Sequence, residues 1–217
     1  MNEKYERLNE FLRKNAATPG ARYLVVRLMG ILIPFFLTLI LALPHPILSV
    51  FLCVCCIGVL AAFLLLYRRS KNDDPSRLLP DVVAWTSSSF MLCLSSYFFV
   101  MMVWDEYVPW KWLLFFLAVW LINYLLTLFL CKRCFLNEKA SKAGGILTPW
   151  TAALLGGVAS CFIVRPLFAN VSQNIAFGIV GICVMLLSLI LGYVGGMFLS
   201  AFFVVKKAKL NDTVQKR

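Results

Sequence analysis

The chain has 217 residues, 61% of them hydrophobic, and its mean hydropathy is +0.84. Soluble domains hold about 45–50% apolar residues, so this composition excludes an ordinary water-soluble domain and requires a lipid environment. A formal charge of +11 is high enough to suggest nucleic-acid binding. The basic residues, however, cluster between the hydrophobic runs, so we expect no nucleic-acid partner.

Six hydrophobic runs are each long enough to cross a hydrocarbon core, which takes roughly 20 helical residues. The runs are apolar all round, whereas strands of a membrane barrel alternate in polarity. We therefore predict an all-α, polytopic integral membrane protein whose six helices form three antiparallel hairpins. The expected spans are 24–43, 47–67, 80–104, 109–131, 146–165 and 175–205.

The chain divides into a cytoplasmic segment, 1–20, a transmembrane domain, 21–205, and a basic tail, 206–217. Charged residues fill positions 3–14, so we expect no cleavable signal peptide. The first segment predicts a short amphipathic helix. Two interpretations remain open: it lies on the inner leaflet or the bundle, or it is a solvated helix stabilised by charge pairs.

The distribution of basic residues predicts the orientation. Of the 21 Lys and Arg residues, all but Lys111 and Arg165 fall in segments on one side of the predicted spans. By the positive-inside rule, both termini are expected in the cytoplasm. The same charge would attract anionic lipid headgroups to the cytoplasmic face.

Charged and proline residues mark the first and third spans. Arg27 lies one turn inside its span, and we expect it to extend toward the headgroups. Pro34 predicts a kink that is tolerated where a neighbouring helix satisfies the freed carbonyl. Asp81 lies in the first turn of 80–104, where a carboxylate interacts favourably with the helix dipole.

Polar side chains share one face of the third span and continue on the fourth. Lipid offers no hydrogen-bond partner, so these faces should turn inward, either as packing surfaces or as the lining of a path. The candidate lining residues are Thr86, Ser89, Cys93, Ser96, Asn123 and Thr127.

Small residues recur at every fourth position of the last span and in the span before it. Such stripes let helix backbones approach closely. We predict that these two helices pack together, or that one packs on another copy; ordinary bundle packing without further activity is the alternative. The residues are Ser188, Gly192, Gly196 and Ser200, with Ala152, Gly156 and Ser160.

Reactive groups are scarce. His45 is the single histidine, and we predict no catalytic residues, no metal site and no cofactor. Cys131 and Cys134 bracket two basic residues at the expected cytoplasmic interface, which makes them candidate S-acylation sites. Redox or metal chemistry, or no special role, are the alternatives for this pair.

These features favour a non-enzymatic membrane subunit, sensor or anchor. It would assemble through its small-residue faces, as a homo-oligomer or with another protein, and engage a cytosolic partner through its basic inner surface. The alternative is a channel or carrier for an ion or a small uncharged or hydrophobic solute, lined by the polar faces of 80–104 and 109–131. An intramembrane enzyme is disfavoured, because no Asp or Glu lies deep in any span.

Overall fold

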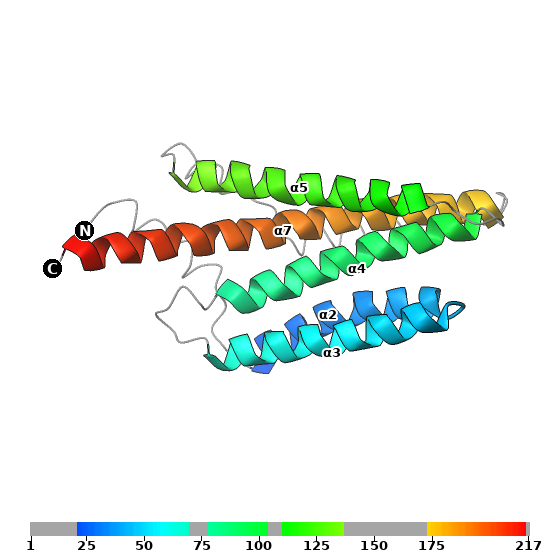
Figure 1. Ribbon diagram of the computed structural model, residues 1–217, viewed down its shortest axis with the longest axis horizontal. Helices are drawn as coiled ribbons and strands as arrows, with labels where there is room; N and C mark the ends of the chain where they lie inside the picture. Colours follow the sequence, from blue (N-terminus) through cyan, green and yellow to red (C-terminus); the bar gives the residue numbers. More distant parts are fainter. Residues whose placement is uncertain (1–20, 70–77, 104–109, 137–172, 216–217) are drawn as a thin grey trace.

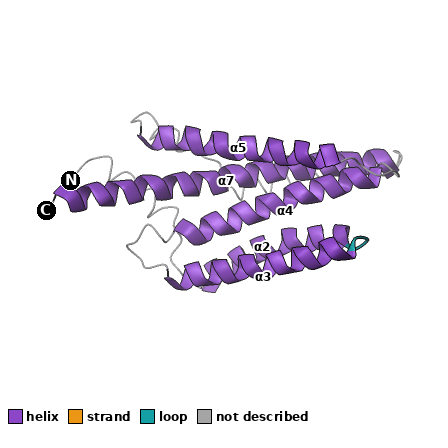
Figure 2. Ribbon diagram, in the orientation of Figure 1, coloured by secondary structure: helices purple, strands orange, loops and turns teal. Residues whose placement is uncertain are grey.

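The computed structural model describes residues 21–69, 78–103, 110–136 and 173–215, and in these ranges all regular structure is helical. Figure 2 shows the short turn that joins the helix ending at Ala42 to the helix beginning at Pro46. The predicted amphipathic helix within 1–20 and the predicted span 146–165 lie outside the described residues. The helices are α2 (Ala21–Ala42), α3 (Pro46–Arg69), α4 (Leu79–Val103), α5 (Trp110–Leu136) and α7 (Gln173–Gln215).

In this part of the chain, five helices are long and apolar enough to cross a membrane. The prediction of a helical, membrane-inserted protein is therefore supported, whereas the count of six spans is not confirmed. The apolar span of α7 covers Ala176–Lys207, and its helix continues to Gln215 through the segment expected to be a basic tail.

The helices form an elongated bundle with α4 at its centre (Figure 1). On one side α4 packs against α7, which also carries α5, and on the other side it packs against α2 and α3. The most extensive helix pair is α4 with α7, whereas α4 and α5 share a small interface. The arrangement as three consecutive hairpins is therefore not confirmed.

The colours of Figure 1, which run from the N-terminus to the C-terminus, show the direction of each helix. A turn after Ala42 joins α2 to the antiparallel α3, and the His45 N–H donates to the Ala42 carbonyl at 2.8 Å. The Ser49 hydroxyl donates to the same carbonyl at 2.8 Å. In contrast, α5 and α7 run parallel, so α5 ends and α7 begins at opposite ends of the bundle.

The position of α4 follows from its composition. It carries buried hydroxyl side chains at Ser88, Ser89, Ser95 and Ser96, and a helix with such a surface must face protein because lipid cannot satisfy it. Large aliphatic and aromatic side chains of α2, α3 and α5, such as Ile33 and Phe129, are instead exposed at the outside of the bundle, where lipid suits them.

Candidate functional site

The interface between α4 and α7 is held by a reciprocal pair of hydrogen bonds between two buried serines. The Ser89 hydroxyl donates to the Ser188 carbonyl at 2.6 Å, and the Ser188 hydroxyl donates to the Ser89 carbonyl at 2.7 Å. The Trp120 indole of α5 donates to the Ser89 hydroxyl at 2.7 Å. We call Ser89, Ser188 and Trp120 the hydroxyl clasp; it joins three helices at one point.

Further polar contacts fix α5 against its neighbours. The Asn123 amide donates to the Leu189 carbonyl of α7 at 3.1 Å, and the Ser200 hydroxyl donates to the Leu128 carbonyl of α5 at 3.1 Å. Thr86 of α4 and Tyr124 of α5 share a hydrogen bond of 3.0 Å between their hydroxyls. The side chains of Asn123 and Tyr124 of α5 are thus used in helix association.

The other predicted polar residues also have protein partners. The Cys93 thiol donates to the Phe116 carbonyl of α5 at 3.5 Å. The hydroxyls of Ser96 and Thr127 donate to carbonyls of their own helices, at 2.9 and 2.8 Å. All six candidate lining residues are therefore engaged with other protein groups.

The small-residue stripe of α7 faces α4 and α5 of the same chain. A Cβ atom added at Gly192 would lie 2.9 Å from the Ser89 hydroxyl, and one at Gly196 would lie 3.0 Å from a methyl carbon of Thr127. These approaches leave no room for a larger side chain. The proposed partner series Ala152, Gly156 and Ser160 lies outside the described residues, and its packing stays a prediction.

A second series of small residues, which the four-residue spacing did not reveal, faces α4 more directly. A Cβ at Gly181 would lie 3.3 Å from the Ser96 carbonyl, and one at Gly195 would lie 3.2 Å from the Thr86 backbone nitrogen. Ser188 lies midway between these glycines. The signal is a seven-residue spacing, which keeps one helix face toward a partner helix.

On the other side of α4 lies a buried ion pair. Arg27 Nε of α2 is 2.6 Å from Asp81 Oδ1, and the two side chains are only 12% and 2% exposed. The guanidinium also lies over the ring of Trp85, at 4.8 Å from its centroid, and over that of Tyr23, at 5.3 Å. The sequence-based expectations, Arg27 at the headgroups and Asp81 with its helix dipole, missed this pairing; buried charges are costly unless paired.

Pro34 has no backbone N–H and so cannot donate to the Gly30 carbonyl one turn earlier. The Ser88 hydroxyl of α4 donates to that carbonyl at 2.7 Å. A neighbouring helix thus satisfies the freed carbonyl, which is the condition under which the predicted kink is tolerated; the kink itself stays a prediction. Pro34 therefore ties α2 to α4.

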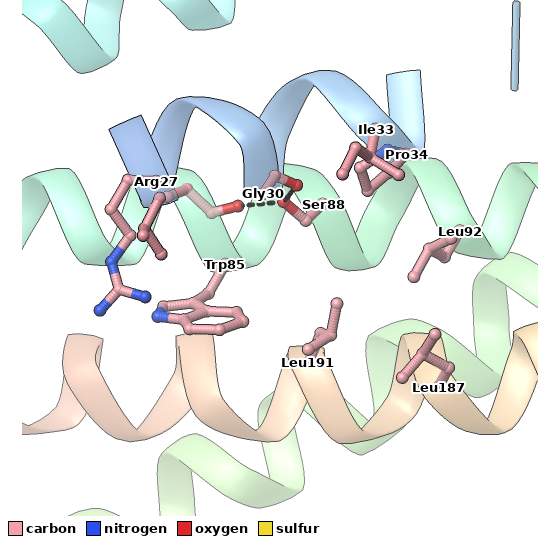
Figure 3. A pocket seen from close by; sticks show the side chains of 11 residues that line it. Arg27, Gly30, Ile33, Pro34, Trp85, Ser88, Leu92, Leu187 and Leu191 are labelled. Atoms are coloured by element: carbon pink, nitrogen blue, oxygen red, sulfur yellow. Dashed lines mark hydrogen bonds between the residues drawn. The ribbon is translucent and has the colours of Figure 1, made fainter. Parts of the chain in front are cut away.

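A cavity of about 210 Å³, partly open at the bundle surface where Val26 and Ile33 are exposed, lies between α2, α4 and α7. Figure 3 shows Arg27 and Trp85 together at one end, with Leu92, Leu187 and Leu191 farther along. Its polar members are Arg27 and Ser88, and the remaining lining is apolar. The lining residues are Val26, Arg27, Gly30, Ile33, Pro34, Ala84, Trp85, Ser88, Leu92, Leu187 and Leu191.

The cysteine pair is only partly described. The Cys131 side chain is buried on α5, whereas the side chain of Cys134 lies outside the description, so S-acylation stays a prediction. Within the described ranges, no three His, Cys, Asp or Glu side chains are grouped so that they could hold a metal ion.

The chain matches no protein-family model, no curated protein and no solved structure. Its function is therefore inferred from its own residues.

Proposed function

We propose that the chain is a non-enzymatic integral membrane subunit, sensor or anchor that binds a cytosolic partner through its basic inner surface. The observation that carries this proposal is the use of the polar faces of α4 and α5. Their hydroxyl, thiol and amide groups bind α7, each other or their own helices. A conduit lined by these faces needs such groups available to a solute, so their engagement favours a scaffold.

Exposed basic side chains at one end of the bundle support a partner of opposite charge. Here α2 begins, α3 ends and the C-terminal part of α7 extends (Figure 1). Among the side chains that the structure describes, Asp81 is the only acidic one, and it is paired with Arg27. A surface of this sign attracts acidic protein surfaces and anionic headgroups. The exposed basic residues are Arg22, Arg68, Arg69, Lys206 and Lys207.

The proposal includes a sixth span and cytoplasmic termini. Because α5 and α7 run parallel, a further crossing between them accounts for their common direction, and we assign it to the apolar run 146–165, which is long enough to span. The small-residue stripe of α7 is occupied by α4 and α5. We therefore assign assembly with a second molecule to surfaces other than this stripe.

Liposome reconstitution tests the proposal against the channel or carrier alternative. The purified protein should give no flux of small ions or uncharged solutes above that of empty liposomes. Flux from the protein alone would overturn the proposal in favour of the alternative.

Retention of a cytosolic partner provides the second test. Replacing Arg68, Arg69, Lys206 and Lys207 by Gln should release a partner that co-purifies in mild detergent. Lys111, an exposed basic residue of α5 at the other end of the bundle, supplies the matched control, and Lys111→Gln should retain the partner. Equal retention in both variants would contradict binding through the basic end.

A further inference from the structure

We propose that the cavity between α2, α4 and α7 holds one acyl chain of an anionic membrane lipid, with the lipid headgroup at Arg27. This site is independent of any cytosolic partner, because it depends only on residues that line the cavity and its charged end.

The shape of the cavity fits a narrow apolar chain. Both α2 and α7 pack extensively on α4, so α4 forms the floor through Trp85 and Leu92, while Gly30 and Leu191 belong to the walls. Pockets for drug-sized ligands measure about 300–1,000 Å³. The cavity, at about 210 Å³, is smaller but exceeds the roughly 150 Å³ that admits a benzene ring in an engineered apolar cavity. A chain segment is the occupant of matching size.

The chemistry of the lining favours an apolar occupant over water. A buried water needs two to four polar partners. The Ser88 hydroxyl has one proton, and the carbonyls of Gly30, at 2.7 Å, and Ala84, at 2.6 Å, already share it. Apart from Arg27, the remaining lining side chains are hydrocarbon, indole or proline rings.

Charge at one end of the cavity selects the headgroup. A guanidinium carries five N–H donors. The ion pair with Asp81 uses Nε, and a hydrogen bond with the Tyr23 side chain uses one more. Exposed Arg22 belongs to the same end of α2, and Lys206 and Lys207 to the corresponding end of α7. Basic pockets between membrane helices on the cytoplasmic side bind anionic headgroups. An acyl chain gains little by leaving lipid for protein, so the selectivity resides in the headgroup.

Native mass spectrometry of the full chain in detergent tests this site. The probes are dioleoyl phosphatidylglycerol, phosphatidylcholine with the same chains, and inorganic phosphate. We expect phosphatidylglycerol to bind about fivefold more tightly than phosphatidylcholine, and phosphate to leave the bound lipid in place. Equal affinity for the two lipids, or displacement by phosphate, would overturn the proposal.

Two glycines provide a matched pair of variants. A Cβ at Gly30, in the cavity wall, or at Gly58, on α3 away from the cavity, would meet nothing within 4 Å. Gly30→Leu should fill the cavity and lower phosphatidylglycerol binding about tenfold, whereas Gly58→Leu should leave binding unchanged. Equal binding by the two variants would show that the lipid does not occupy this cavity.

Photo-cross-linking in native membranes decides the result even if Gly30→Leu folds poorly. A benzoylphenylalanine introduced at Ile33, which lines the cavity and is exposed at the bundle surface, should label an anionic lipid. Labelling of residues 146–165 instead would identify this chain's own segment as the occupant and overturn the proposal.

Discussion

Polar groups are buried on both sides of α4, but they are satisfied in different ways. Toward α7, neutral serines exchange hydrogen bonds with backbone carbonyls, and glycines bring the helices so close that an added Cβ would collide. Toward α2, a charged pair is buried beside a cavity, and Gly30 has open space around it.

The difference shows that glycines in membrane helices can have different structural roles. At Gly195 the absence of a side chain permits contact with the Thr86 backbone, whereas at Gly30 it leaves volume unfilled. A glycine in close contact with a neighbouring helix therefore indicates a helix interface, whereas a glycine beside open space indicates room for a ligand. Substitutions on the two sides should differ accordingly.

The largest effect is expected from breaking the ion pair. Arg27→Ala leaves the Asp81 carboxylate buried without its partner, which should cost about 3–5 kcal/mol of unfolding free energy. Unfolding by SDS titration in mixed micelles measures this change. Arg27→Met combined with Asp81→Leu should restore most of the loss, and Arg22→Ala, at an exposed site, serves as the control. A stable single variant would show that the pair contributes little.

The next effect concerns the close approach of α7 to α4. Gly195→Leu forces a side chain against the Thr86 backbone, whose nitrogen would lie 3.2 Å from the new Cβ. Overpacking of this kind should cost about 3 kcal/mol. Gly58→Leu makes the same chemical change in open space and should stay within roughly 0.5–1 kcal/mol of the wild type, on the stabilising side, because leucine favours a helix. Similar thermal midpoints for both variants would contradict the tight interface.

A smaller loss is expected where Ser88 supports the proline-containing helix. Ser88→Ala leaves the Gly30 carbonyl without the hydrogen bond from α4 and should cost about 1–2 kcal/mol. The neighbouring Ser87 donates only to carbonyls of its own helix, at Val83 and Ala84, so Ser87→Ala should change stability less. The same SDS titration compares the two variants, and a reversed order would refute the role of Ser88.

The smallest effect is the coupling within the hydroxyl clasp. A double-mutant cycle with Ser89→Ala and Trp120→Phe removes the hydrogen bond that the Trp120 indole donates to the Ser89 hydroxyl. It should yield about 0.6 kcal/mol, the average measured for such side-chain pairs between membrane helices. Additive losses would mean that the indole and the hydroxyl do not stabilise each other.

The described helices were largely predictable, because hydrophobic runs alone determine which segments leave water. The predicted span 80–104, for example, appears as Leu79–Val103. Helix pairing was less accessible, since every span is apolar all round and several faces offer small or polar residues. The main partner of α4 is α7 and not the adjacent α5, and the seven-residue spacing of Gly181, Ser188 and Gly195 was the available clue.

The ion pair between Arg27 and Asp81 could not be predicted from the sequence, for a different reason. Arg27 and Asp81 each have a satisfactory local explanation, a flexible side chain near headgroups and a carboxylate at a helix start. Only the packing of α2 on α4 brings them within 2.6 Å. The cavity beside them depends on the separation of helix axes, which no residue pattern encodes.

The link between Pro34 and α4 bears on biogenesis. During synthesis α2 enters the bilayer before α4 has been made, yet its Gly30 carbonyl gains its partner only from Ser88 of α4. The Thr38 hydroxyl likewise lies within hydrogen-bonding distance of the Met91 carbonyl and the Ser95 hydroxyl of that later helix. The hydrogen bonding of α2 is thus completed by α4, which leaves the ribosome later.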